Sequence, residues 1–339
     1  MNSMGRVLVV QLFGESRGTA VGVVIDGIPP GLPLSSADFE PDLARRRAGA
    51  PGTTGRVESD EPEILSGLYR GRCTGTPLCA VFRNRDAEPA AYDESTVPRP
   101  GHADFTGSVR YKGFADPRGS GHFSGRLTVG LVAAGVVAKK LLAGVRFDTR
   151  ILEAGGKPDV AMAVREAVDA GDSVGAIVEL RAAGLPAGLG EPFFGTVEGE
   201  VARALFAVPG VRGVDFGDGF AAARMRGSEH NDPFVAADGR TSRNGAGGVN
   251  GGVTNGNELV VRVAVKPASS IAAPQETLDF ATGKMTTLSV DGRHDACIAL
   301  RAAVVLEAAC ALALADLMLL ARARGDHAAG DMVATEDLR

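Results

Sequence analysis

The sequence contains no tryptophan and only three tyrosines among its 339 residues, and its net charge is −5. A surface that binds nucleic acid needs a local or overall basic excess and aromatic side chains on which bases can stack. None of the 14 phenylalanines is interleaved with Arg or Lys in such a pattern. We therefore expect no nucleic acid among the partners of this chain.

Cysteine is scarce as well. Cys73, Cys79, Cys297 and Cys310 stand at spacings that fit neither a disulfide framework nor a zinc site, which indicates reduced thiols and predicts no metal centre. The first 13 residues hold a short apolar run without the small-residue cleavage site of a secretory signal. Together these features predict a cytoplasmic protein.

Linker-like segments are missing too. No Ser/Gly-rich or Pro-rich tract interrupts the chain, and no block of like charge is longer than Arg45-Arg46-Arg47. Two tethered domains would need such a segment between them. The sequence therefore predicts one domain over residues 1–324, followed by a polar C-terminal tail at 325–339 that we expect to be mobile.

Long apolar runs occur in two places, at residues 127–142 and 298–320. Each run is apolar nearly all round, which is typical of helices buried in a core. A membrane span needs about 20 uncharged residues, whereas charges at Arg301, Glu307 and Asp316 interrupt the second run, and Lys139-Lys140 ends the uncharged part of the first. We expect two core helices and no membrane association.

Shorter β-rich runs surround these helices. The expected strands are residues 20–26, 78–82, 174–180, 211–216 and 258–265, and amphipathic helices are expected at 159–170 and 197–207. The strands do not alternate regularly with helices, which disfavours a doubly wound parallel sheet. The pattern predicts an α+β fold of mixed layers around two buried helices.

Positive charge is concentrated in one stretch of this acidic chain, residues 99–126. The stretch holds five cations and two histidines: Arg99, Arg110, Lys112, Arg118, Arg126, His102 and His122. Guanidinium groups present forks of donors that match phosphate and carboxylate oxygens, and a histidine among them can move a proton near neutral pH. We therefore expect a phosphorylated small acid as ligand and proton-transfer chemistry.

Both apolar helices begin directly after a basic, glycine-containing loop, at residues 118–126 and 292–297. Helix N-termini attract anions through unpaired N–H groups and the helix dipole, so the two starts could face one ligand. The segments 266–270 and 244–252 supply a Lys, hydroxyls and exposed backbone N–H groups, which are the parts of a second polyanion or cofactor site.

Each of these features also has an ordinary interpretation. A loop histidine such as His102 can be structural, Asp295 beside Arg293 can form a salt bridge, and Arg45-Arg46-Arg47 can be a solvated face. The glycines at 119–125 can form a tight turn, because their spacing misses the dinucleotide fingerprint by one residue. Sequence adjacency does not separate these readings.

Seven short motifs, in one order along nearly the whole chain, resemble the chorismate synthase family. They are Gly14-Glu-Ser-Arg-Gly18, Arg45-Arg-Arg47, Arg99-Pro-Gly-His-Ala-Asp104, Gly190-Glu-Pro192, Gly213-Val-Asp-Phe-Gly-Asp-Gly219, Lys266-Pro-Ala-Ser-Ser270 and Gly292-Arg-His-Asp295. The resemblance implies a single-domain β-α-β sandwich with helices between antiparallel sheets. It implies a carbon–oxygen lyase that converts 5-enolpyruvylshikimate 3-phosphate to chorismate and phosphate by 1,4-anti elimination.

The resemblance also implies partners and a cofactor. The family requires reduced FMN without net oxidation or reduction and is associated with NADP, and it forms homotetramers. No reductase module is visible in this chain, so the resemblance implies an external flavin reductase or another source of reduced flavin.

The resemblance assigns roles to individual residues. Proton transfer falls on His102, Asp295 and Arg17, with Asp295 helping to take the substrate proton through the flavin. Substrate binding falls on Ser16, Arg46, Arg99, Arg126 and Arg293. Flavin binding falls on His122, Phe123, Ser124, Pro209, Gly210, Gly251, Lys266, Pro267, Ala268, Ser269, Ser270 and Arg293.

The chain departs from the family pattern at several positions. Arg17 stands where the family has histidine, and an arginine cannot donate a proton at neutral pH. The usual Arg-Ser-Ser is His122-Phe123-Ser124, the usual Asn-His-Ala-Gly-Gly begins Asn244-Gly, and Arg56 is the nearest substitute for a second expected Arg. One alternative is therefore an impaired homologue that binds flavin and a phosphorylated acid without efficient turnover. Another uses His102 and Asp295 for a different phosphate elimination or hydrolysis.

Overall fold

The computed structural model describes residues 2–86, 96–290, 292 and 294–325. Arg293, to which the resemblance assigns substrate and flavin binding, lies outside the described residues, and so does the tail from residue 326 onward.

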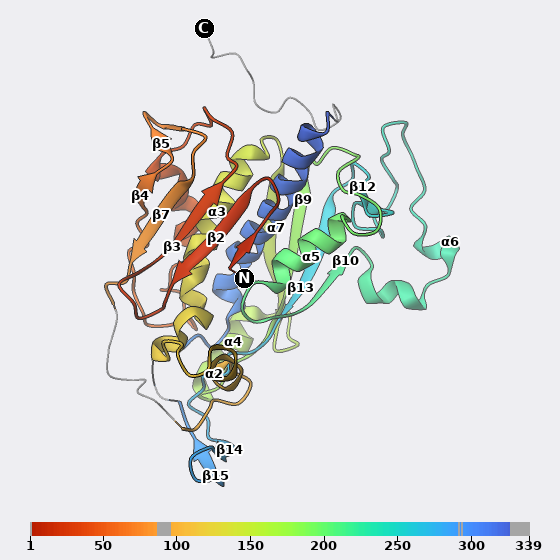
Figure 1. The fold of residues 1–339 in the computed structure, drawn as a ribbon. Coiled ribbons are helices and arrows are strands. Elements are labelled where there is room, and N and C mark those ends of the chain that lie inside the picture. The colour runs from red at the N-terminus through yellow and green to blue at the C-terminus, as the bar shows by residue number, and fades with distance from the viewer. Residues whose placement is uncertain (1, 87–95, 291, 293, 326–339) are drawn as a thin grey trace.

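Five antiparallel strands form one outer layer of the molecule (Figure 1). In sheet order they are β1 (Ser3–Met4), β2 (Val9–Gly14), β3 (Ala20–Asp26), β7 (Leu78–Arg83) and β4 (Glu63–Ser66). Alternate side chains of the central strand β3 are almost fully buried, at Val21, Val23 and Ile25. Successive strand residues point to opposite faces, so one face of this sheet is directed at the core.

Four longer antiparallel strands form the other outer layer. Their order is β10 (Val211–Phe216), β13 (Leu259–Val265), β9 (Ala176–Ala183) and β8 (Arg146–Ala154). Strand β13 alternates strictly between buried and half-buried residues, and its four buried residues are all aliphatic. This alternation identifies the face of the second sheet that packs on the helices.

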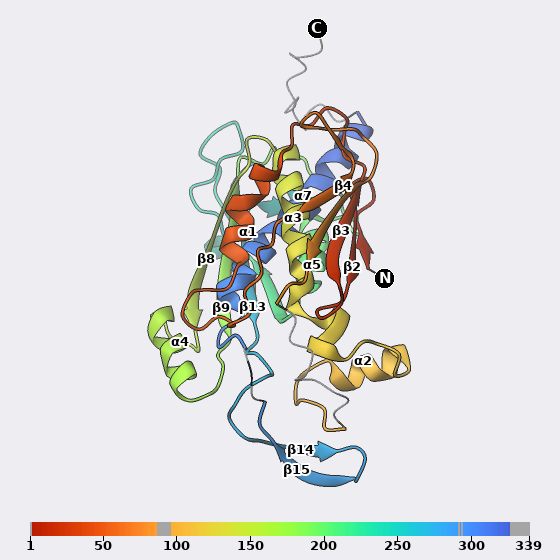
Figure 2. The same cartoon turned by 90° about the vertical axis from the view of Figure 1, so that its left-hand side faces the viewer.

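Helices fill the space between the two sheets (Figure 2). They are α3 (Thr128–Leu141), α7 (Ala299–Ala323), α1 (Glu40–Arg46) and α5 (Val197–Phe206). Helix α3 packs on β3 and β7, and α7 packs on β8 and β9. The two helices approach closely, because a Cβ atom at Gly135 would lie 2.3 Å from the Cβ of Ala308. The α+β sandwich implied by the resemblance is confirmed.

The remaining elements are short or lie outside the three layers. Helices α2 (Asp104–Tyr111) and α4 (Val160–Asp169) and the hairpin β14 (Gln275–Asp279) and β15 (Lys284–Leu288) lie at one end of the sandwich (Figures 1 and 2). The others are β5 (Leu68–Tyr69), β6 (Arg72–Cys73), α6 (Gly227–His230), β11 (Val249–Asn250), β12 (Val253–Thr254) and the 3-10 helices Ser36–Phe39, Arg118–Phe123, Gly125–Leu127 and Gly219–Arg224.

The predicted apolar helices are confirmed as α3 and α7, and the two amphipathic helices as α4 and α5. By length and composition the segments Arg118–Leu141 and Ala299–Ala323 could cross a membrane, but 72% and 89% of their most apolar windows are buried inside the protein. That burial is expected of core helices. The analysis of the sequence did not identify β2, β8, α1 or α2, whose residues are more polar or lie beside glycine-rich loops.

Two acidic residues of α7 are buried, and both are paired. Glu307 accepts hydrogen bonds from Arg45 Nη1 and Nη2 at 2.9 and 2.7 Å and from Lys139 Nζ, which connects α7 to α1 and α3. Asp316 accepts the backbone N–H groups of residues 6–8 and so attaches the N-terminal segment to α7. Burial alone raises the pKa of Glu307, but Arg45 and Lys139 lower it to about 2.

We predict that Glu307→Gln lowers stability in a pH-dependent way. Because the pKa of Glu307 falls from 4.5 to about 2 on folding, its contribution is complete above pH 4.5 and is lost as the pH falls toward 2. The variant should be less stable by about 2–4 kcal/mol at pH 7. Urea unfolding at several pH values should show this difference disappearing between pH 4.5 and 2. Glu166→Gln, which breaks the more exposed pair with Lys157, is the control and should change little.

Candidate active site

A cavity of about 870 Å³ lies beside α2, whose residue Thr106 lines it. Its apolar wall includes Leu12 of β2, Leu131 of α3 and Val305 of α7. Its polar wall comes from the loops before α3 and α7, from the loop after β2, from the end of α1 with the segment that follows it, and from the segments around residues 99–102 and 266–270. The starts of α3 and α7 both line it, at Thr128 and Ile298. The tertiary structure thus brings together the two helix starts that the sequence indicated as anion sites.

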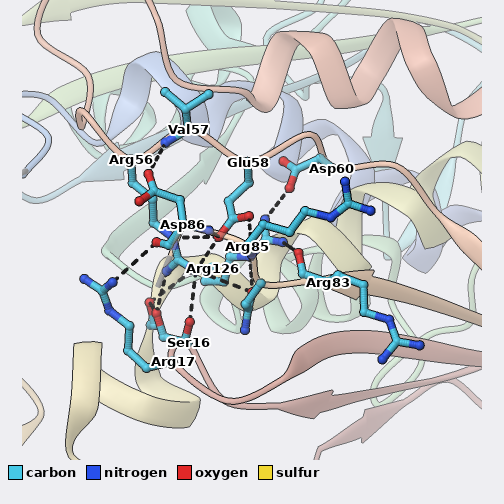
Figure 3. Close-up of polar contacts among 12 residues, drawn as sticks. Ser16, Arg17, Arg56, Val57, Glu58, Asp60, Arg83, Arg85, Asp86 and Arg126 are labelled. Carbon is cyan, nitrogen blue, oxygen red and sulfur yellow. Dashed lines mark hydrogen bonds and ion pairs between the residues drawn. The ribbon is translucent and has the colours of Figure 1, made fainter. Parts of the chain in front are cut away.

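A buried carboxylate, Asp60, lies between two arginines in one wall of the cavity. Figure 3 shows it with one of them, Arg126. Asp60 accepts hydrogen bonds from Arg46 Nη1 at 2.9 Å and from Arg126 Nη1, and all three side chains are at most 4% exposed. Arg46 also donates to Thr128 Oγ1 and to the carbonyl of Gly125, at 3.0 Å each. Burial lowers the pKa of Arg46 to about 9 although the charge of Asp60 opposes that shift. Both guanidinium groups are therefore held rigidly at the start of α3.

A second carboxylate orients Arg56, the substitute considered for the missing family arginine (Figure 3). Glu58 Oε1 accepts from Arg56 Nε at 3.1 Å and from Nη2 at 2.7 Å. Arg56 Nη1 donates to Ser16 Oγ at 3.0 Å, and its Nη2 donates to the Ser16 carbonyl. Burial lowers the pKa of Arg56, and Glu58 opposes that shift. Arg56 therefore lies against a predicted substrate-binding residue, in the cavity wall.

Arg17 lies on the loop between β2 and β3 and lines the same cavity. Its Nη1 donates to the carbonyl of Asp86 at 3.4 Å (Figure 3). This loop is hydrogen-bonded to the loop before α3, because Ser16 N donates to the Gly121 carbonyl at 3.0 Å and His122 Nδ1 donates to the Gly14 carbonyl at 2.8 Å. The Arg17 and His122 loops therefore form one continuous wall.

His102 is held by two charged residues of the same loop. Its Nδ1 lies 2.6 Å from Asp104 Oδ1, and Arg99 donates to both carboxylate oxygens of Asp104, from Nη2 at 2.7 Å and from Nε at 2.8 Å. Arg99 Nη1 also donates to Ser270 Oγ at 2.9 Å, which links the loop to the 266–270 segment. A cation, a titratable imidazole and its carboxylate thus form one unit at the cavity.

Asp295 is fixed just before α7. Its Oδ1 accepts the backbone N–H of Thr54 at 2.8 Å, and its Oδ2 accepts from Arg301 Nη1 at 3.2 Å. Arg301 Nε also donates to the carbonyl of Arg46 at 2.9 Å, so the same arginine joins α7 to the end of α1. Thr54, Asp295 and Arg301 all line the cavity.

Most of the residues to which flavin binding was assigned lie around this cavity. The lining ones are His122, Phe123, Ser124, Pro209, Gly210, Lys266, Ala268, Ser269 and Ser270. Lys266 Nζ donates to the Gly101 carbonyl at 3.0 Å, and Ser269 Oγ donates to the same oxygen at 2.8 Å. Pro267 does not line the cavity, and Gly251 lies at the turn between β11 and β12, away from it.

A family model for chorismate synthase matches residues 8–319. The chain belongs to the chorismate synthase family. It is therefore an enzyme, a carbon–oxygen lyase that acts on phosphates. The match confirms the resemblance carried by the seven motifs and gives no support to the alternative of an impaired homologue.

Named relatives agree with the family match. A chorismate synthase of Chitinophaga pinensis is 55% identical over 322 residues, which cover 94% of this chain and 97% of that protein. One of Thermococcus kodakarensis is 44% identical over 347 residues, with 94% and 98% coverage. A crystal structure of a chorismate synthase shares the fold, with a TM-score of 0.73 at 27% identity and coverage of 94% of this chain and 93% of the other.

Several residues of this chorismate synthase family site were not singled out from the sequence. Asp60 and Arg301 form ion pairs with predicted residues that lie on other elements, Arg46, Arg126 and Asp295. Glu58 pairs with Arg56, two positions before it. Asp104 had a local signal, because it stands two residues after His102 in a motif that begins with Arg99. Ser120 lay inside the predicted loop, where its neighbouring glycines suggested only a turn.

We predict that Asp60→Asn destabilises the protein by about 3–5 kcal/mol, because two buried guanidinium groups lose the counter-charge that they share. Asn also adopts the left-handed backbone that Asp60 shows, with φ of 52°, so the substitution isolates the charge. Urea unfolding measures the effect. Glu63→Gln, which breaks the exposed pair with Arg83, is the control and should leave the midpoint unchanged. Equal midpoints for both variants would contradict the prediction.

Proposed function

We propose that this cavity converts 5-enolpyruvylshikimate 3-phosphate to chorismate and phosphate by 1,4-anti elimination, with reduced FMN bound beside the substrate. The observation that carries the proposal is the convergence of Arg17, Arg46, Arg56, Arg99 and Arg126 with His102 around one cavity. Guanidinium groups suit a substrate that carries one phosphate and two carboxylates. Family membership supports the same reaction.

The residues of the cavity fit a flavin mononucleotide. A volume of about 870 Å³ can hold a cofactor and a small substrate together. Lys266, Ser269 and Ser270 offer a cation and hydroxyls to polar groups, and Phe123, Leu131 and Val305 offer apolar surface to a ring system. Bound reduced flavin would supply electron density to the allylic cation that develops as phosphate leaves.

The arginines stabilise the departing phosphate in this mechanism. Arg46 and Arg126 are already locked by Asp60, and Arg56 by Glu58, so little reorganisation is needed when negative charge develops on the leaving oxygen. Exclusion of water by the bound ligands strengthens these interactions.

Two groups carry protons in the proposed mechanism. His102, paired with Asp104, donates toward the leaving phosphate or the cofactor, and Asp295 accepts the proton that the substrate loses. The Thr54 N–H and Arg301 hold the Asp295 carboxylate in one orientation. Arg17 contributes a permanent positive charge and transfers no proton.

The proposal also covers the compartment, the oligomeric state and the source of reduced flavin. We expect a cytoplasmic homotetramer that takes reduced flavin from an external reductase, for which NADPH is the expected electron source. The four cysteines are all unpaired in the described structure, in keeping with a reducing compartment.

We predict anaerobic turnover of 5-enolpyruvylshikimate 3-phosphate only when chemically reduced FMN is present. Chorismate absorbance and phosphate release, followed together, should give equal yields, since the elimination forms one of each. His102→Ala and Asp295→Asn should each lower kcat by about 10²- to 10⁴-fold. Phosphate released without flavin, or from unrelated phosphomonoesters, would instead indicate a different phosphate reaction.

We predict that position 17 acts through charge. Arg17→Lys should keep most of the activity, Arg17→Gln should lower kcat/KM by about tenfold or more, and Arg17→His should bring no gain. Steady-state kinetics with saturating reduced FMN distinguish these outcomes. A large gain in kcat for Arg17→His would mean that the site lacks a proton donor and that the chain is an impaired homologue.

A further inference from the structure

Three consecutive residues in the loop before α3 adopt left-handed backbone, and the middle one is a serine. The φ angles are 57° at Gly119, 69° at Ser120 and 49° at Gly121. Space requires glycine at position 121, because a Cβ there would lie 2.1 Å from the Asp116 carbonyl oxygen. A Cβ at Gly119 would make a tight contact of 3.0 Å with the Arg17 side chain. Ser120 carries a Cβ in a conformation that glycine adopts at lower cost. A non-glycine residue in this conformation suggests that its side chain has a functional role.

The hydroxyl of Ser120 lies between two residues of the proposed mechanism. Ser120 Oγ is 3.2 Å from His102 Nε2 and 3.1 Å from Arg99 Nη2. All three residues line the cavity. The left-handed backbone at position 120 is what allows a loop on the α3 side to reach the loop that carries His102.

The direction of each hydrogen bond follows from Asp104. Burial raises the pKa of Asp104, but hydrogen bonds from Arg99 and His102 outweigh burial and hold the pKa well below its ordinary value. Asp104 is therefore a carboxylate that only accepts, so His102 Nδ1 carries a hydrogen toward Oδ1 at 2.6 Å. In the neutral imidazole Nε2 then accepts, and the Ser120 hydroxyl is its donor.

The remaining hydrogens are also accounted for. Arg99 Nη2 has two hydrogens, which go to Asp104 Oδ1 at 2.7 Å and to Ser120 Oγ at 3.1 Å. Its 3.1 Å contact with His102 Nδ1, which itself carries a hydrogen, is then not a hydrogen bond. Ser120 thus accepts from the guanidinium and donates to the imidazole. Without this hydroxyl, the imidazole of His102 would keep its hydrogen bond at Nδ1 to Asp104 and have none at Nε2 among the described residues.

We propose that Ser120 is a positioning residue whose hydroxyl bridges Arg99 and His102 and holds the imidazole in one ring orientation and one tautomer, so that His102 exchanges its proton at Nε2. This inference rests on the proposed role of His102 in proton transfer. The free-energy cost of a Cβ at this backbone position is offset by the two hydrogen bonds.

Two substitutions at position 120 distinguish the effect of the hydroxyl from the effect of the backbone conformation. Ser120→Gly and Ser120→Ala both remove the bridge, but Gly also relieves the left-handed strain whereas Ala keeps it. We expect kcat to fall by about tenfold to a hundredfold in both variants, with KM changed by less than about threefold. The thermal midpoint of the Gly variant should be above that of the Ala variant.

A second readout tests the bridge without turnover. The ¹⁵N resonances of His102 in the ligand-free protein, assigned with His102→Gln, should show Nδ1 protonated and Nε2 accepting a hydrogen bond. In both Ser120 variants the Nε2 resonance should move, while the resonance of His230, which lies on α6, stays in place as an internal control.

Three results would overturn the inference: full kcat in both variants, loss of kcat in the Gly variant alone, which would indicate loop mobility, or an unchanged Nε2 resonance. If the unmodified enzyme lacks the proposed activity, the kinetic arm fails for that reason, and the ¹⁵N resonances still decide whether the bridge exists.

Discussion

Helix α7 imposes the constraint on which the other parts depend: it is buried along most of its length, yet Arg301, Glu307 and Asp316 place charges there that must be paired. Asp316 accepts hydrogen bonds from backbone N–H groups that precede β2. Glu307 forms ion pairs with Arg45 of α1 and Lys139 of α3, and Arg301 forms one with Asp295 at the cavity. A buried charge without a partner is strongly destabilising. The same pairs therefore order the sandwich and fix one end of the active site.

In the cavity wall, too, buried charges are paired, but here the buried charges to be neutralised are mainly arginines. Its arginines are in part neutralised by carboxylates before any ligand arrives, Asp60 for Arg46 and Arg126, and Glu58 for Arg56. Each carboxylate offsets the cost of burying a guanidinium group and also restricts the orientation of that group. A site built in this way meets an anionic substrate with donors already oriented, which lowers the entropy lost on binding.

The loops before α3 and after β2 act as one unit. Hydrogen bonds from Ser16 N to Gly121 and from His122 to Gly14 join them, and the left-handed run at 119–121 brings Ser120 to His102. Arg17 and His122 lie on these two joined loops and both line the cavity. The wall that the loops form therefore presents one guanidinium and one imidazole.

The local sequence was enough to predict much of the fold and to name most of the candidate site residues. The all-round apolar runs predicted α3 and α7, and short β-rich runs predicted β3, β7, β9, β10 and β13. The ordered motifs gave candidate site roles to the arginines, His102 and Asp295, because these signals lie within a few consecutive residues. The pairings of Asp60 with Arg46 and Arg126, of Arg301 with Asp295, and of Ser120 with His102 were decided only by the tertiary structure. The two residues of each pair are between 6 and 66 positions apart in the sequence. The local sequence around a charged residue does not indicate which distant residue will pair with it.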